Sequence, residues 1–220
     1  YRKLLSDYQK LAATFHFRTC YSILMLPKKF YENAINHLYQ EELGEIITDD
    51  KNIFEELQQL YAGNPDILSK IRFYENDAIS LGTLYSFETQ IQRAISERVW
   101  MKSGAYLIIQ PTEALTVIDV NSGKNTSGKN AEEYYYKINL EAAAEISRQL
   151  RLRNISGIVI VDFINMAKEE QRKELMHQFR LSLKEDPVPV RLLDITKLGL
   201  VELTRKKERK TLLEQVAQLR

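Results

Sequence analysis

The chain has 220 residues, which allows one large domain or two small ones and suffices for a sizeable buried core. Its 31 Lys and Arg residues nearly balance its 30 Asp and Glu residues, so the bulk charge identifies no partner. The single cysteine, Cys20, excludes an intramolecular disulfide and a cysteine-rich zinc site within one chain, and it fits a cytoplasmic location. No apolar run reaches the about 18 residues of a membrane span, and no signal-peptide pattern opens the chain.

The first half of the chain predicts helices over about 3–16, 29–40, 51–61 and 84–98. Strand-like segments lie between them, at 21–26, 44–48 and 70–74. Asp49 or Asp50 can cap the helix that starts at residue 51, and 62–66 is the clearest turn. Residues 31–60 hold eight acids against one base, whereas residues 197–220 hold seven bases against three acids. The basic end favours an anionic partner or, equally, a solvated helix face.

The second half predicts a largely parallel sheet, because strands and helices alternate in it. Strands are expected at 105–109 and 114–120, joined into a hairpin by a turn at 110–113, and again at 188–193. Long helices are expected over about 131–153, capped by Asn130, and over about 167–184. The apolar run 158–161 is typical of a strand covered on both faces. A composition shift near residue 95 marks a candidate domain boundary.

Two carboxylates are the sharpest candidates for chemistry. Asp119 and Asp162 each follow an apolar strand, and one helical crossover joins the two strands. These strands should therefore be parallel and close, with both carboxylates at the edge where open α/β sheets bind ligands. Asn121 faces the same way if its strand continues. Two carboxylates, an amide oxygen and waters suit Mg²⁺, although each Asp could instead cap a helix or close a turn.

The loop after the first of these strands offers an alternative. Residues 123–129 match the first seven positions of a phosphate-binding P-loop, which would make the protein a nucleotide hydrolase dependent on Lys129. However, position eight is Asn130 rather than Ser or Thr, so the usual hydroxyl ligand of Mg²⁺ is missing.

Basic residues near the predicted strand ends are candidates for phosphate contacts. Lys124, Lys197 and Arg205 are the expected ones, since Lys and Arg neutralise phosphates. Tyr134 and Tyr136 are candidates for stacking on unpaired bases, whereas Tyr135 belongs to an apolar helix stripe.

Motifs spread over residues 100–206 resemble the catalytic region of the ribonuclease E/G family in order and spacing. They comprise Ser103-Gly104-Ala105 with 112–123, 139–143 with 148–153, then 157–166 and 199–205. The resemblance implies a Mg²⁺-dependent endoribonuclease of RNA processing and decay that cuts single-stranded RNA and leaves 5′-phosphate and 3′-OH ends. It implies that Asp119 and Asp162 hold the metal and that Asn121 assists.

The resemblance also implies an α/β fold in three parts. Residues 95–220 would form a DNase I-like catalytic subdomain, 31–94 part of an RNase H-like subdomain, and 1–30 the tail of a sensor for 5′-monophosphate ends. The family's S1 RNA-binding domain has no counterpart here, and the Cys-Pro-x-Cys of its zinc link is absent. The chain is therefore expected to be a fragment that keeps the metal site but not the zinc-linked assembly. A homo-oligomer and a noncatalytic RNA-binding module stay open.

Overall fold

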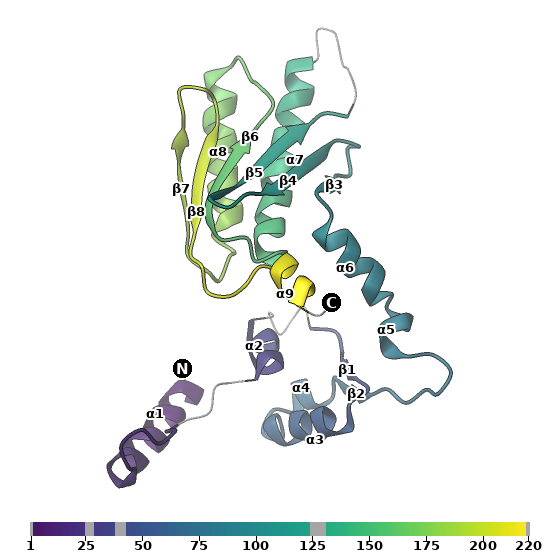
Figure 1. Cartoon of the computed structure of the whole chain (residues 1–220), viewed down its shortest axis with the longest axis vertical. Helices are drawn as coiled ribbons and strands as arrows, with labels where there is room; N and C mark the ends of the chain where they lie inside the picture. The colour runs from purple at the N-terminus through teal and green to yellow at the C-terminus, as the bar shows by residue number, and fades with distance from the viewer. Residues whose placement is uncertain (1, 25–28, 38–42, 124–130, 219–220) are drawn as a thin grey trace. The chain divides into compact units, whose positions relative to one another are not determined.

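The computed structural model describes residues 2–24, 29–37, 43–123 and 131–218 (Figure 1). The chain divides into two compact units, Tyr1–Asn76 and Asp77–Arg220. This division differs from the composition shift near residue 95, because the two short helices before that position belong to the second unit. Among the described residues, none of the helices is long and apolar enough to cross a bilayer.

The first unit is mainly helical. Its elements are α1 (Arg2–Thr14), the 3₁₀ helix η1 (Phe15–Phe17), α2 (Phe30–His37), β1 (Ile46–Thr48), α3 (Lys51–Leu60), α4 (Pro65–Leu68) and β2 (Ile71–Phe73). The strands β1 and β2 pair in parallel, and α3 packs on both. The predicted helices and both of these short strands are confirmed within the described residues. The strand expected at 21–26 is wrong for residues 21–24, which form a turn and bend.

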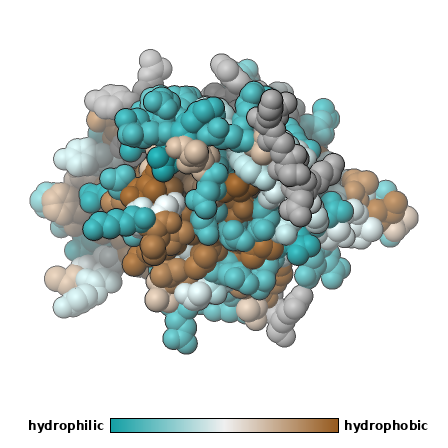
Figure 2. All heavy atoms as spheres, turned by 90° about the horizontal axis from the view of Figure 1, so that it is seen from above, coloured by the Kyte–Doolittle hydropathy of each residue, from teal (hydrophilic) through white to brown (hydrophobic). Residues whose placement is uncertain are grey.

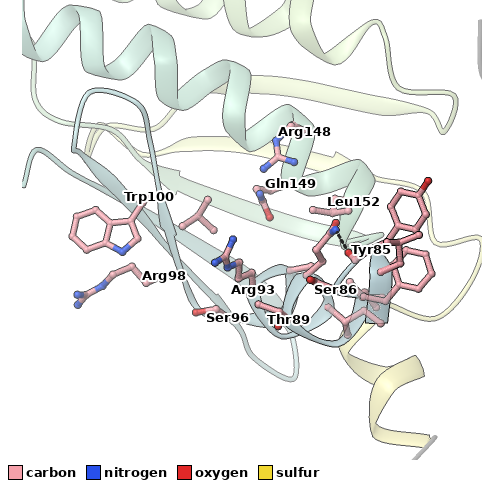
Figure 3. A pocket seen from close by; sticks show the side chains of 17 residues that line it. Tyr85, Ser86, Thr89, Arg93, Ser96, Arg98, Trp100, Arg148, Gln149 and Leu152 are labelled. Atoms are coloured by element: carbon pink, nitrogen blue, oxygen red, sulfur yellow. Dashed lines mark hydrogen bonds between the residues drawn. The ribbon is translucent and has the colours of Figure 1, made fainter. Parts of the chain in front are cut away.

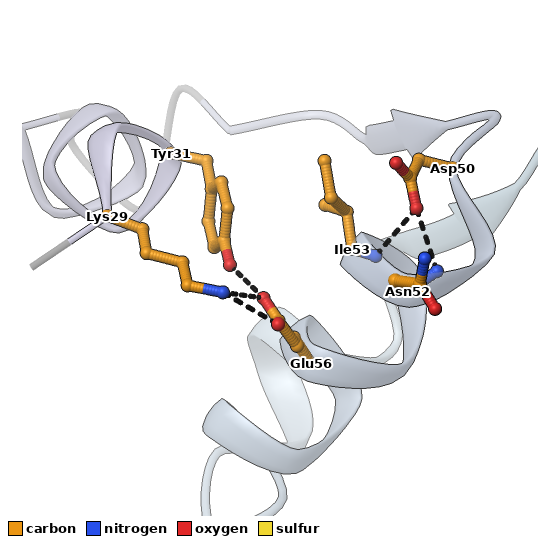
Figure 4. A network of polar contacts seen from close by, with 6 residues as sticks. All are labelled: Lys29, Tyr31, Asp50, Asn52, Ile53 and Glu56. Atoms are coloured by element: carbon orange, nitrogen blue, oxygen red, sulfur yellow. Dashed lines mark hydrogen bonds and ion pairs between the residues drawn. The ribbon is translucent and has the colours of Figure 1, made fainter.

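Polar side chains fix the start and the middle of α3 in the first unit (Figure 4). The Asp50 carboxylate caps the helix as predicted, since its Oδ1 accepts hydrogen bonds from the backbone N–H of Asn52 at 2.8 Å and of Ile53 at 3.1 Å. Further along, the carboxylate of Glu56 accepts hydrogen bonds from Lys29 at 2.6 Å and from the hydroxyl of Tyr31. These bonds, that from Lys29 first, lower the pKa of Glu56 below its usual value.

The second unit contains a six-stranded sheet. Its elements are α5 (Leu81–Leu84), α6 (Phe87–Ile95), β3 (Arg98–Trp100), β4 (Tyr106–Pro111), β5 (Leu115–Asn121), α7 (Ala131–Leu152), β6 (Gly157–Asp162), α8 (Glu169–Leu183), β7 (Val190–Ile195), β8 (Val201–Arg205) and α9 (Leu212–Gln218). The helix predicted over 84–98 is shorter in the structure, where it is α6. Ser86, whose φ is +51°, separates it from α5, and residue 98 begins β3. The strands β3 and β8 and the helix α9 were not predicted.

The sheet is mixed rather than largely parallel. Its strand order is β3-β4-β5-β6-β8-β7, and among these neighbours only β5 and β6 run in the same direction. The prediction failed because β8 turns back from β7 and inserts between β7 and β6, which makes both of its pairings antiparallel. The β4–β5 hairpin is confirmed, but Pro111 pairs with Thr116, so its turn follows residue 111.

The helices α7 and α8 lie on the same side of this sheet (Figure 1). The core between them includes Ile118 of β5, Val159 and Val161 of β6, and Phe179 of α8. Burial alternates along β5 and β6, so the residues between these point to the opposite face. There Ile158 is 49% exposed, which shows that the expectation of a strand covered on both faces was wrong.

Candidate functional site

The structure brings Asp119 and Asp162 together at the ends of the two parallel strands. They are direct partners in the β5–β6 register, and neighbouring strands lie about 4.8 Å apart. Both follow the alternation that places them on the face of the sheet away from α7 and α8. Asp119 is half-buried and Asp162 is exposed, so both carboxylates are accessible from one side.

Asn121 lies on the same face, as the sequence predicted. It is the last residue of β5, and its Nδ2 donates a hydrogen bond to Oδ2 of Asp119 at 2.7 Å. This bond occupies one lone pair of the Asp119 carboxylate and fixes the orientation of the group. The amide oxygen of Asn121 and the remaining lone pairs of Asp119 stay available as oxygen ligands.

The donor set fits a hard divalent cation. Among the described residues, neither Asp119 nor Asp162 forms an ion pair, so two like charges face one another without a compensating base. A cation held between them would relieve this repulsion. The same part of the chain contains no cluster of three or more His, Cys, Asp or Glu side chains suited to a metal. Waters would have to complete the coordination, which is how Mg²⁺ is commonly bound.

A buried asparagine on α7 holds the segment that follows Asp162. The Asn139 side chain is fully buried. Its Nδ2 donates to the carbonyl of Ile164 at 2.7 Å, and its Oδ1 accepts from the N–H of Ile164 at 3.0 Å. The two bonds satisfy both backbone polar groups of a residue two positions after Asp162. No role was predicted for Asn139, although it lies within one of the motifs that resemble the family.

Replacing Asn139 by Leu, which has a similar shape, should lower the free energy of unfolding by about 1–3 kcal/mol, because the N–H and C=O of Ile164 would be left unpaired. Urea denaturation measures the change. The control is Lys137→Ala on the exposed side of the same helix, which should change stability by less than about 0.5 kcal/mol. Equal stability of the Asn139 variant and the unchanged chain would contradict this role.

Loops next to the site are packed against one another. The Glu141 carboxylate of α7 accepts hydrogen bonds from the N–H groups of Lys102 at 2.7 Å and Ser103 at 3.3 Å, between β3 and β4. Gly123, just after β5, has a φ of +70°, and a Cβ atom there would lie 2.4 Å from the carbonyl oxygen of Gly104. Only glycine meets both the backbone conformation and this close approach, which explains the glycine at position 123.

The predicted phosphate contacts have different outcomes. Lys124 lies outside the described residues, as do most of the P-loop match at 123–129 and the cap Asn130. Lys197 is exposed, between β7 and β8. The phosphate contact predicted for Arg205 is not supported. Its side chain is only 3% exposed, its Nε donates to Asp186 at 2.8 Å, and its Nη1 donates to Asn154 at 2.9 Å. A guanidinium buried in this way is not available to a phosphate.

The tyrosines of α7 also differ from expectation. Tyr134 and Tyr136, the candidates for stacking, are partly buried and pack against the core of the second unit. An exposed aromatic surface is found elsewhere, on β3, where Trp100 is 63% exposed. This surface was not predicted, because a strand of three residues is too short to show alternation.

A groove of about 1660 Å³ runs between the α5–α6 segment, β3 and the last turns of α7 (Figure 3). Three arginines, Arg93, Arg98 and Arg148, line it, and neither Asp119 nor Asp162 does. Arg148 is engaged by Glu145, with Nη2 and Oε1 2.7 Å apart. Burial opposes ionisation of Glu145, but the hydrogen bonds from Arg148 and Gln149 outweigh it and lower the pKa of that carboxyl. The groove is therefore a basic surface next to the six-stranded sheet, and it is separate from the site of Asp119 and Asp162.

The comparisons with known proteins identify the family. The Ribonuclease E/G family model matches residues 1–208. The chain is 38% identical over 181 residues to Ribonuclease G of Salmonella typhimurium (strain SL1344), covering 82% of this chain and 37% of that protein. It is 36% identical to Ribonuclease E of Escherichia coli (strain K12), over 79% of this chain and 16% of the relative. It is 37% identical to Ribonuclease E of a Synechocystis species (strain PCC 6803), over 86% of this chain and 28% of the relative.

The family model and these relatives point to the same family. The chain belongs to the ribonuclease E/G family. It spans less than two-fifths of the length of each of these relatives.

Proposed function

We propose that this chain carries the catalytic centre of an endoribonuclease that uses Mg²⁺ to hydrolyse single-stranded RNA in RNA processing and decay. The observation that carries the proposal is the direct pairing of Asp119 with Asp162 on one open face of the sheet, in a chain of the ribonuclease E/G family. The names of its relatives, Ribonuclease G and Ribonuclease E, support the reaction.

In this proposal each polar residue of the site has one task. Asp119 and Asp162 hold the metal, and Asn121 orients Asp119 through the hydrogen bond to its Oδ2. Mg²⁺ bound there would polarise the scissile phosphate and lower the pKa of a bound water. This chemistry needs no nucleophilic side chain: water would attack the phosphorus, the bond from phosphorus to the 3′ oxygen would break, and that oxygen would take up a proton. The products would carry 5′-phosphate and 3′-OH ends. Asn139 keeps the segment after Asp162 in place from α7.

The finer assignments are proposals of the same kind. They are a DNase I-like subdomain over 95–220, part of an RNase H-like subdomain over 31–94, the tail of a 5′ sensor over 1–30, and a cytoplasmic location. Lys124 and Lys197 are proposed to contact the RNA backbone. The alternative is a noncatalytic RNA-binding fragment.

The test is cleavage of a 5′-monophosphorylated single-stranded RNA with Mg²⁺ and with excess EDTA. We expect cutting with Mg²⁺, loss of cutting with EDTA, and recovery when Mg²⁺ is restored, because two carboxylates alone supply no Lewis acid. Cutting that is unchanged by EDTA would contradict metal dependence. Salt-sensitive RNA binding without any cutting would favour the noncatalytic fragment. Loss of activity in Lys129→Ala, together with hydrolysis of free nucleotide, would favour the P-loop alternative.

A further inference from the structure

Three side chains on β3 and β4 form a cluster, which we call the aromatic platform: Arg98, Trp100 and Tyr106. The rings of Trp100 and Tyr106 are 5.1 Å apart between centroids. The Arg98 guanidinium carbon lies 4.7 Å from the Tyr106 ring centroid and 5.7 Å from that of Trp100. Figure 3 shows Arg98 and Trp100 side by side, pointing away from Arg148 and Gln149 of α7.

The strand register places this platform on the same face as the carboxylate pair. Trp100 pairs with Tyr106, and Tyr106 pairs with Asn121. In the next row on that face, Arg98 pairs with Ile108, which pairs with Asp119. The intervening residues Leu107 and Val120 belong to the core under α7 and α8, which confirms the alternation.

The platform therefore lies close enough to the proposed metal site for one RNA strand to reach both. β3 lies two strands from β5, so Trp100 and Asn121 are separated by roughly 10 Å across the sheet. Figure 2, the view from above, shows apolar side chains in brown lying among hydrophilic ones in teal. A strand of RNA that places a phosphate between Asp119 and Asp162 would bring a neighbouring base close to the aromatic platform.

The chemistry of the platform suits an unpaired base with its phosphate. Trp100 is 63% exposed, a large flat apolar surface open to water. Among the described residues Arg98 forms no ion pair, and its flat face is used by the rings, so its N–H edge can donate to a phosphate oxygen. Aromatic side chains next to a cation are what proteins use to bind single-stranded nucleic acid.

We infer that the aromatic platform of Arg98, Trp100 and Tyr106 is a binding subsite for one unpaired base of the RNA, next to the phosphate held at Asp119 and Asp162. This inference rests on the proposed function for the identity of the ligand. The subsite selects single-stranded over double-stranded RNA, because the bases of a duplex already stack on one another. A second copy of the chain is the other partner that could cover the exposed Trp100.

Trp100 provides its own reporter, since it is the only tryptophan in the chain. In the Asp119→Asn variant, which is expected to bind RNA without cutting it, single-stranded RNA should quench the Trp100 emission. An abasic strand of the same length and charge, and a duplex of the same sequence, should leave the emission nearly unchanged. Equal quenching by the abasic strand, or no quenching by single-stranded RNA, overturns the inference. So does emission that changes with protein concentration alone, which would indicate a second copy.

Affinity measurements provide the second arm. Trp100→Ala should weaken binding of single-stranded RNA roughly 5- to 150-fold, the range found for loss of one stacked base. Trp100→Phe should recover most of the affinity, because it keeps an aromatic face. The matched control is Leu181→Ala, which removes another exposed apolar side chain, but from α8 on the opposite side of the sheet. A Trp100→Ala variant that binds like the Leu181 control overturns the subsite.

The two proposals fail in different ways. If wild type cuts RNA with Mg²⁺ while Trp100→Ala cuts with unchanged KM and kcat, the nuclease stands and the platform falls. If single-stranded RNA quenches Trp100 in Asp119→Asn but the wild type cuts no RNA with Mg²⁺, the platform stands and the nuclease assignment of this chain falls.

Discussion

Replacing Asp119 by Asn should reduce the rate of RNA cleavage at least about 100-fold while leaving RNA affinity within about threefold of the unchanged protein. The substitution keeps the shape of the side chain but removes the charge that would hold a cation opposite Asp162. The same result is expected for Asp162→Asn. The measurement is single-turnover cleavage of a labelled RNA, in a form of the protein that cuts it, together with binding by anisotropy.

The control for this loss is another carboxylate of the same sheet. Asp194 is an exposed residue of the edge strand β7, and Asp194→Asn should cut at the normal rate. Equal rates for Asp119→Asn and the unchanged protein would remove Asp119 from the metal site. A parallel loss in both Asp119→Asn and Asp194→Asn would point to a general effect of charge on RNA binding instead.

The second large effect concerns the stability of the second unit. Asp186→Ala should lower the free energy of unfolding by about 3–5 kcal/mol, because it leaves the buried guanidinium of Arg205 without its charge partner. Asp186 accepts two hydrogen bonds from Arg205, at 2.8 and 3.1 Å, and its own side chain is only 1% exposed. Urea denaturation of the variant and the unchanged chain measures the difference.

Two further variants decide whether the effect comes from the buried pair. Glu208→Ala breaks the exposed pair with Lys206 and should cost less than about 1 kcal/mol. Combining Asp186→Ala with Arg205→Met removes both charges and should recover part of the lost stability. If the single variant Asp186→Ala unfolds at the same urea concentration as the unchanged chain, the pair is not a stabilising feature.

The positions of the candidate site residues were largely predictable, because they depend on local chain geometry. An apolar strand, a long helix and a second apolar strand predict two parallel neighbouring strands, and the β5–β6 register places Asp119 beside Asp162. Asn121 follows from the two-residue repeat of a strand. Helix ends were similarly local, as the Asp50 cap shows.

The remaining features depend on contacts between distant segments. Nothing in residues 188–205 shows that the second of two consecutive strands inserts next to β6. The burial of Arg205 follows from that insertion, because it places the guanidinium against Asp186 and Asn154. The aromatic platform was missed for a related reason. Arg98 and Trp100 form a cluster only because the pairing of β3 with β4 places Tyr106 beside them.

The insertion of β8 between β6 and β7 also sets an order of assembly. β6, which ends in Asp162, pairs on one side with β5 and on the other side with residues 201–205. During synthesis from the N-terminus, that second side of β6 has no partner until those residues have emerged, about 40 positions after Asp162. The hairpin, α7 and β6 can pack first, whereas the edge of the strand that bears Asp162 stays open to pairing with other chains. The final strand of the sheet therefore protects the nascent protein from aggregation as well as completing its core.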